Sequence, residues 1–195
     1  MDEIREKKVG IRNDMVNMIE GYSDSEREAR TQQIEDRLFD FANFIESRIP
    51  LLYVDLPTEV PTENIIRRCF TQNKIVILPV FDKDKKTVSL WKVDNFDRDL
   101  KPGPRGVLEP DTGRCKKVPL DRVDIAIVPG YAFDEKGGRI GSGNGYYDWL
   151  IPELSATTRK VALAFEEQII PQIPMESHDK FVDIIVSDQR IIYKI

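Results

Sequence analysis

The chain has 195 residues, of which 41% are hydrophobic and 32% are charged. This length is enough for one domain with a sizeable core, and the apolar fraction excludes a chain that is disordered throughout. The 29 basic and 34 acidic residues give a net charge of −5. General binding to nucleic acid is therefore not expected, because it requires a basic surface.

Cysteine and histidine are scarce in this chain. Cys69 and Cys115 lie far apart and His178 is the single histidine, so a structural zinc site is excluded. Residues 1–12 are charged and lack the apolar core of a signal peptide, and no apolar run approaches the roughly 18 residues of a membrane span. We therefore expect a cytoplasmic protein with reduced thiols and no membrane partner.

Helical spacing marks the first fifty residues. Apolar side chains recur at this spacing in two sets, namely Ile4, Ile11, Met15 and Met18, then Ile34, Leu38, Phe41 and Ile45. The pair Gly21-Tyr22 separates the two predicted helices. Ser23 and Glu26 form a capping-box pattern at the start of the second one.

Apolar runs typical of buried strands follow the two helices. They occupy residues 49–55, 74–80, 88–93, 124–128, 160–165, 182–186 and 191–195. Two further helices are predicted, a short one that Thr62 caps and another at 146–154. Residues 94–122, rich in Pro, Gly and charge, are predicted to form a long loop. Strands that alternate with helices favour a single α/β domain whose sheet is covered on both faces.

A glycine-rich segment lies between the apolar run at 124–128 and the predicted helix at 146–154. Five of the nine residues at 137–145 are glycine, which lets a ligand approach the backbone closely. The first N–H groups of the helix would suit an anion, and Arg139 adds a cation that can bind phosphate through two hydrogen bonds.

Two familiar phosphate loops do not match this segment. A Walker A loop ends in Gly-Lys-Ser/Thr, whereas Gly143 is followed here by Asn144. A dinucleotide-binding fingerprint needs a final glycine at the position that Tyr146 occupies. An anion-binding loop and a flexible turn between strand and helix both stay open.

Charged residues elsewhere offer further candidates. Arg5, Lys8 and Arg12 lie at positions i, i+3 and i+7 of the first predicted helix and form one basic stripe. Like charges at this spacing are mildly destabilising unless something such as a bound polyphosphate offsets them. A solvated helix face with nearby acidic counter-ions is the alternative.

Three carboxylates are also candidates. Glu59 follows a predicted strand, and strand ends are common ligand sites in open α/β sheets, although an ordinary loop residue is the alternative. Asp148 and Asp179 are suited to Mg²⁺, which binds one or two carboxylates together with substrate phosphates and waters. His178 is interpreted as a surface or loop residue, since no Ser or Cys nucleophile pattern accompanies it.

The region around the glycines resembles the signature of the 5-formyltetrahydrofolate cyclo-ligase family. The resemblance rests on the runs VPGYAFD at 128–134, GRIG at 138–141 and GNGYYD at 143–148. Shorter matching pieces occur in the family's order and cover nearly the whole chain: KVGIR at 8–12, EVPT at 59–62, GVLEP at 106–110, ALAFEEQ at 162–168, and HD at 178–179 with VD at 182–183.

This resemblance implies an α/β fold with a central, mostly parallel sheet, helices on both faces and an N-terminal helical pair. It also implies ATP- and Mg²⁺-dependent ring closure of 5-formyltetrahydrofolate to 5,10-methenyltetrahydrofolate, with release of ADP and phosphate. The expected partner is this small molecule, with or without a polyglutamate tail, and we expect a monomer.

By position, the resemblance also implies roles for individual residues. ATP is expected at Lys8, Val9, Gly10, Ile11, Arg12, Arg139, Ile140, Gly141, Ser142, Gly143, Asn144, Gly145, Tyr146 and Tyr147. The folate is expected at Val54, Glu59, Ser142, Gly143, Asn144, Gly145 and Tyr146. Arg139 and Tyr146 are the implied catalytic residues, and Asp148 and Asp179 the implied Mg²⁺ ligands.

The sequence departs from the family pattern at two positions. Ser142 stands where the family often has a basic residue, and Val80 follows Pro79 where Lys or Arg is common. We expect both departures to affect the rate of the reaction and the affinity for the substrates more than the presence of activity. Two alternatives to the cyclo-ligase activity are a non-catalytic regulator of the same fold that binds folate or nucleotide, and an ATP-dependent enzyme acting on another formylated or carboxylated amine.

Overall fold

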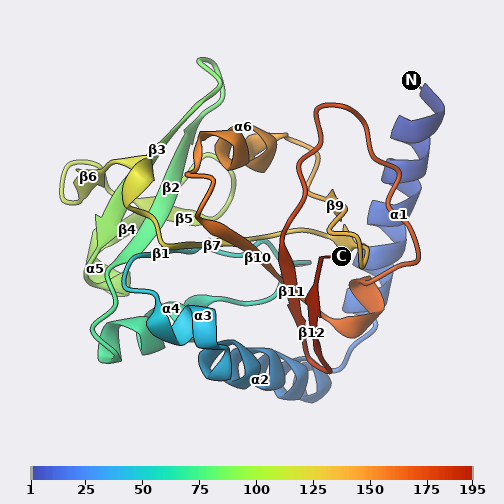
Figure 1. Ribbon diagram of the computed structural model, residues 1–195, viewed down its shortest axis with the longest axis horizontal. Coiled ribbons are helices and arrows are strands. Elements are labelled where there is room, and N and C mark those ends of the chain that lie inside the picture. The colour runs from blue at the N-terminus through green and yellow to red at the C-terminus, as the bar shows by residue number, and fades with distance from the viewer. Residues whose placement is uncertain (1, 195) are drawn as a thin grey trace.

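An eight-stranded sheet forms the centre of the protein in the computed structural model, which describes residues 2–194 (Figure 1). In spatial order its strands are β12 (Ile191–Tyr193), β11 (Ile184–Ser187), β10 (Arg159–Ala164), β7 (Ile125–Val128), β1 (Pro50–Leu51), β2 (Val76–Asp82), β3 (Thr87–Val93) and β6 (Lys116–Val118). The five strands from β11 to β2 run parallel, whereas β12, β3 and β6 join antiparallel at the two edges. The expectation of a mostly parallel sheet is confirmed.

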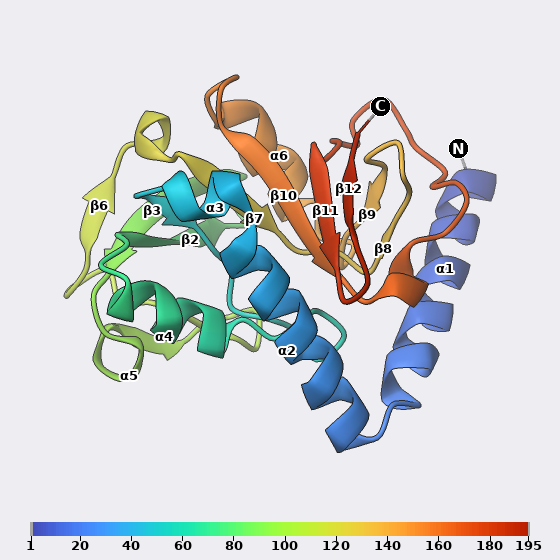
Figure 2. The same cartoon turned by 60° about the horizontal axis from the view of Figure 1, so that its bottom comes forward.

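Helices cover both faces of this sheet, as expected. The helices α2 (Asp24–Asp40), α3 (Ala42–Glu46) and α4 (Glu63–Thr71) lie on one face, and α6 (Tyr146–Glu153) lies on the other (Figure 1). The predicted N-terminal helical pair is present as α1 (Asp2–Glu20) and α2. These two helices diverge from the turn that joins them, so α1 stands beside the sheet (Figure 2).

The central strands are buried along their whole length, which accounts for their nearly continuous apolar sequences. All four residues of β7 and of β11 are buried, because helices or loops cover both faces of a parallel sheet. On α2, Ile34 and Leu38 are completely buried, in agreement with the predicted apolar face. The other two residues of that predicted face lie beyond the end of α2: Phe41 is buried, but Ile45 is 57% exposed on α3. Ser23 caps this helix by accepting a hydrogen bond from the Glu26 N–H at 3.2 Å.

A second, smaller apolar cluster holds α1 in place. Met15 of α1 packs there against Ala132, Ile140 and Ile173. Ala132 and Ile140 belong to a short hairpin formed by β8 (Ala132–Phe133) and β9 (Arg139–Ile140). The helix is therefore docked on the segment that leads into the glycine-rich region.

Two expectations for residues 49–62 need correction. The strand expected at 49–55 is only the two residues of β1, because the chain leaves the sheet after Leu52 and turns toward α4. In that turn the Thr62 hydroxyl donates to the Tyr53 carbonyl oxygen, so the predicted side-chain cap of α4 does not form. The other predicted strands occur with ends shifted by a few residues, and Ile195 lies outside the described residues.

The prediction of a long loop at 94–122 is wrong. This segment contains α5 (Phe96–Asp99), β4 (Leu100–Pro102), β5 (Leu108–Pro110), β6 and a 3-10 turn (Leu120–Arg122). Each element is only three or four residues long, so it carries no recognisable period. One of them, β6, pairs with β3 about 25 positions earlier in the chain, a pairing that no local pattern reveals.

No helix among residues 2–194 is both long and apolar enough to cross a membrane.

Candidate active site

A cavity of about 770 Å³ opens where β1 and β7 end. Residues that directly follow these strands line it, including Tyr53 and Val54 after β1 and Pro129 after β7. Ligands of open α/β sheets bind at this edge, outside the carboxyl ends of the strands. The remaining walls are one side of α1, the glycine-rich segment with the start of α6, and residues 176–180.

Basic residues outnumber acidic residues in the lining of this cavity. Six basic residues line it, namely Arg5, Lys8, Arg12, Arg105, Arg139 and Lys180. Four acidic residues line it as well, namely Glu59, Asp148, Glu176 and Asp179. In a protein whose net charge is −5, this excess of cations marks the cavity as a site for an anion.

Lys8 of α1 is held between two carboxylates. Its Nζ donates to Glu176 Oε2 at 2.8 Å and to Asp179 Oδ2, and the residue is only 6% exposed. Burial works to lower the pKa of Lys8, but the hydrogen bonds that Lys8 donates to the two carboxylates, together with their charge, outweigh it and the pKa is raised. The segment at 169–183, which runs beside α1, supplies both carboxylates (Figures 1 and 2).

Arg12, one helical turn after Lys8, joins α1 to the glycine-rich segment. Its Nε donates to the Gly141 carbonyl oxygen at 2.8 Å. The two basic side chains therefore lie on the cavity side of α1, while Met15 packs on the second apolar cluster. The basic stripe is thus a wall of the cavity, which favours the anion-binding interpretation over that of a solvated face.

Arg139 lies at the base of the cavity and is 5% exposed. Its Nη1 donates to the Pro129 carbonyl oxygen at 3.0 Å, and its Nη2 to Asp148 Oδ1 at 2.9 Å. The buried Nε has no hydrogen-bond partner among the described residues. A buried guanidinium with an unused donor is well placed to bind a further oxygen atom of a ligand.

The glycine-rich segment ends at α6, whose first turn borders the cavity. Gly145 is the N-cap residue of α6 and has φ = 71°, in the left-handed region that glycine enters without strain. This conformation lets Tyr146, Tyr147 and Asp148 begin the helix at the cavity wall. The free N–H groups of a first helical turn favour an anion.

Glu59 is a buried acid in the loop that follows β1. It is 4% exposed and accepts a hydrogen bond from the Leu56 N–H at 2.9 Å. Burial raises the pKa of Glu59 to about 7, although Arg105 and Arg139 act in the opposite direction. A carboxyl group with this pKa changes its protonation state near neutral pH, as groups at binding and catalytic sites often do.

The two aspartates expected to bind Mg²⁺ both line the cavity. Asp148 is paired with Arg139 and Asp179 with Lys8, and Asp179 also lies close to Glu176 and His178. Carboxylate oxygens are the donors that Mg²⁺ prefers, so the residues present fit this ion.

Most of the sequence-predicted site residues meet in this cavity. They are Lys8, Arg12, Val54, Glu59, Arg139, Ile140, Gly141, Ser142, Gly143, Gly145, Tyr146, Tyr147, Asp148 and Asp179. Val9, Gly10, Ile11 and Asn144 do not line it. Of the two departures from the family pattern, Ser142 borders the cavity and Val80 does not.

Other lining residues carried no recognised signal in the sequence. Glu176, Arg105 and Lys180 are examples. Glu176 lies only three positions before Asp179, within a charged cluster at 176–180. Arg105 lies within the segment predicted to be a loop, and no spacing connects it with Glu59 or Tyr146.

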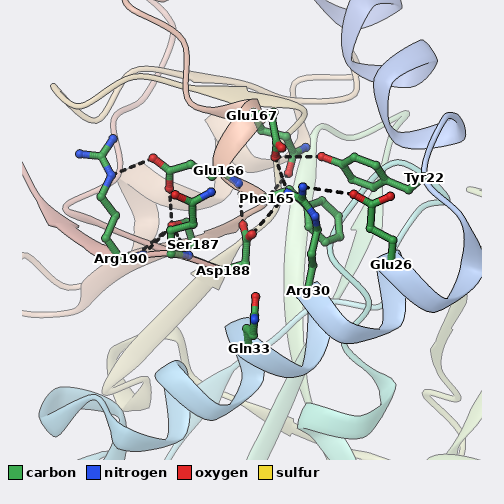
Figure 3. A network of polar contacts seen from close by, with 12 residues as sticks. Tyr22, Glu26, Arg30, Gln33, Phe165, Glu166, Glu167, Ser187, Asp188 and Arg190 are labelled. Atoms are coloured by element: carbon green, nitrogen blue, oxygen red, sulfur yellow. Dashed lines mark hydrogen bonds and ion pairs between the residues drawn. The ribbon is translucent and has the colours of Figure 1, made fainter.

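A network of polar side chains fixes the turn after α1 (Figure 3). Tyr22 Oη donates to Glu167 Oε2 at 2.9 Å, and Arg30 of α2 pairs with the same oxygen at 2.6 Å. Arg30 also lies 3.4 Å from Asp188, whose side chain is 4% exposed. Single exposed ion pairs stabilise little, but this network joins the end of α1 to the segments that follow β10 and β11.

Comparisons with known proteins agree with this geometry. Residues 4–188 match the model of the 5-formyltetrahydrofolate cyclo-ligase family. The mouse 5-formyltetrahydrofolate cyclo-ligase is 27% identical over 188 residues, which cover 92% of this chain and 93% of the mouse protein. A probable 5-formyltetrahydrofolate cyclo-ligase of Caenorhabditis elegans is 30% identical over 213 residues, 99% of this chain and 98% of that protein.

A solved structure is similar over nearly the same extent. The 5,10-methenyltetrahydrofolate synthetase of Aquifex aeolicus superposes with a TM-score of 0.83 at 28% identity, covering 95% of this chain and 92% of the other. The match of sequence and fold thus extends over α1, the glycine-rich segment and residues 176–180, which together build the cavity. The chain belongs to the 5-formyltetrahydrofolate cyclo-ligase family.

Proposed function

We propose that this protein converts 5-formyltetrahydrofolate to 5,10-methenyltetrahydrofolate, using ATP and releasing ADP and phosphate. The observation that carries the proposal is the arrangement of charge in the cavity, in a chain of this family. Lys8, Arg12 and Arg139 supply cations from α1 and the glycine-rich segment, and Glu59 supplies a buried acid from the loop after β1. A polyphosphate and a reduced pterin require such a pair of sites.

ATP lies against α1 and the start of α6 in this proposal. The cations of α1 and Arg139 bind its phosphates, and the first N–H groups of α6 add further donors. The folate lies toward Val54 and Glu59, where the carboxyl group accepts hydrogen bonds from the amino-substituted ring. This placement brings the formyl group and the γ-phosphate together near Tyr146.

Asp148 and Asp179 hold Mg²⁺ in this proposal. When bound, the ion neutralises part of the charge on the phosphates. Asp179 pairs with Lys8 and Asp148 with Arg139, so each carboxylate would hold the ion beside a cation of the protein.

The reaction proceeds in two steps. The formyl oxygen attacks the γ-phosphorus, the bond to ADP breaks, and a phosphorylated iminium-like species forms. Nitrogen 10 then attacks the activated carbon, the C–O bond breaks with phosphate leaving, and the N10 proton is released to solvent. No covalent enzyme intermediate is required, so the protein acts by positioning the reactants and stabilising charge.

Turnover by the purified protein tests the proposal. The protein is mixed with 5-formyltetrahydrofolate, Mg²⁺ and ATP, and the absorbance of the methenyl product is followed. We expect product formation that requires ATP and releases ADP in equal amount. Folate binding without ATP-dependent product would instead support a non-catalytic binding protein, and product from a different formylated amine would support the second alternative.

A further inference from the structure

Arg105 is a cavity residue to which neither the sequence patterns nor the proposed mechanism gives a role. It lies at the tip of the hairpin formed by β4 and β5, where the Gly103 N–H donates to the Val107 carbonyl oxygen at 2.9 Å and closes the turn. Its neighbours Pro104 and Gly106 are exposed, whereas Arg105 is half-buried and lines the cavity. The hairpin therefore directs this one side chain inward.

Aromatic rings hold the guanidinium by its face. Its Cζ atom lies 4.9 Å from the ring centroid of Phe81 and 5.5 Å from that of Tyr146. These two rings lie against each other, with centroids 4.9 Å apart. A cation over aromatic rings is held by cation–π attraction, which uses none of its N–H groups.

The donors of Arg105 are not used among the described residues. Its Nε is buried without a hydrogen-bond partner, and its guanidinium forms no ion pair within 4.0 Å with a carboxylate in this part of the chain. A guanidinium that lines a cavity with its donors unused is suited to bind a ligand oxygen.

Arg105 lies toward Glu59 and Tyr147 rather than toward α1. It acts electrostatically on Glu59 and Tyr147, as Arg139 also does, and on Glu109 of β5, but it is not among the charges that act on Arg12. Arg105 is therefore close to Glu59, where the proposed function places the folate.

We propose that Arg105 is a substrate-binding residue that donates hydrogen bonds to an oxyanion of the bound folate, so that the β4–β5 hairpin forms a wall of the active site. This inference rests on the proposed function. Two oxyanions of the substrate meet the requirement, namely the carboxylates of the glutamyl tail and the phosphorylated formyl oxygen of the intermediate. Both are planar or multidentate acceptors that match an arginine fork.

The test compares Arg105→Met, which removes the charge, and Arg105→Lys, which keeps it without the planar fork. Lys101→Met is the matched control, because Lys101 lies on β4 of the same hairpin, pairs with Asp111 at 3.2 Å and does not line the cavity. The Kd for 5-formyltetrahydrofolate is measured by calorimetry without ATP, and kcat and both KM values are measured in the turnover assay.

One pattern of results is expected if Arg105 binds a glutamyl carboxylate. Arg105→Met raises the Kd and KM for the folate about tenfold, with the KM for ATP nearly unchanged, and Arg105→Lys recovers part of the loss. The defect disappears with 5-formyltetrahydropteroate, which lacks the glutamyl tail. If Arg105 instead binds the phosphorylated oxygen, kcat falls about tenfold with 5-formyltetrahydrofolate and with 5-formyltetrahydropteroate alike.

Equal Kd, KM and kcat for Arg105→Met and Lys101→Met would overturn the inference. So would raised KM values for ATP and folate alike together with a lowered thermal midpoint, because Arg105 would then only stabilise the hairpin. If the wild-type protein binds the folate but shows no turnover, the proposed function fails, while the Kd comparison still decides the role of Arg105.

Discussion

Glu59 leads to a quantitative prediction about the stability of the protein. Burial raises the pKa of its carboxyl group from 4.5 to about 7, and the residue is 4% exposed. Below pH 4.5 both the folded and the unfolded chain carry the proton. As the pH rises toward 7 the unfolded chain releases this proton first, so the stability contributed by neutral Glu59 is lost progressively, and the whole loss is present above the folded-state pKa.

The size of this loss follows from the shift. One pKa unit corresponds to about 1.4 kcal/mol, so a rise from 4.5 to about 7 amounts to about 3 kcal/mol in total. Between pH 5 and pH 8 the linkage relation gives about 2 to 3 kcal/mol. In Glu59→Gln the side chain does not ionise, so this variant lacks that part of the pH dependence.

Urea unfolding of the ligand-free protein at pH 5 and pH 8 measures the effect. The free energy of unfolding of Glu59→Gln minus that of the wild type should increase by about 2 to 3 kcal/mol from pH 5 to pH 8. Glu46→Gln is the control, because Glu46 is exposed on α3. If the difference for Glu59→Gln is the same at both pH values, the carboxyl group is not held neutral by burial and the reasoning is refuted.

Three further predictions concern the site and its support. Arg139→Ala leaves Asp148 without its partner and should lower kcat about a hundredfold or more, so an unchanged rate in the turnover assay would contradict the role of Arg139. EDTA should abolish turnover and Mg²⁺ should restore it, and activity that persists in EDTA would exclude a required divalent ion. Gly137→Ala should destabilise the protein by more than about 1 kcal/mol in urea unfolding, because Gly137 has φ = 83° and an added Cβ would lie 2.3 Å from the Val182 carbonyl oxygen. Gly10→Ala, where nothing lies within 4 Å of the added Cβ, should not destabilise it.

The sequence by itself determined the main elements of the fold. The strands β7, β10 and β11 were predicted because a parallel sheet covered on both faces requires nearly continuous apolar runs. The helices α1 and α2 were predicted from their periodic apolar residues, and both occur. These patterns are local consequences of burial, so they can be read without knowing what each element packs against.

Short elements could not be predicted in this way. β4, β5 and β6 have three residues each, too few for a period, and they form because their partners in space are present. For the same reason the sequence does not predict the place of Arg105 in the cavity, which depends on the β4–β5 hairpin. The segment is predicted to be a loop, although it supplies part of the wall of the cavity.

Individual members of the site were predictable, but their arrangement was decided by the tertiary structure. The glycines, Arg139 and the basic stripe on α1 were recognised from residue type and spacing. The pairing of Lys8 with Glu176 joins residues 168 positions apart, and that of Arg12 with Gly141 joins residues 129 positions apart. Spacing along the chain carries no information about such contacts, because they exist only after α1 docks on the β8–β9 hairpin and the segment at 169–183 closes beside it.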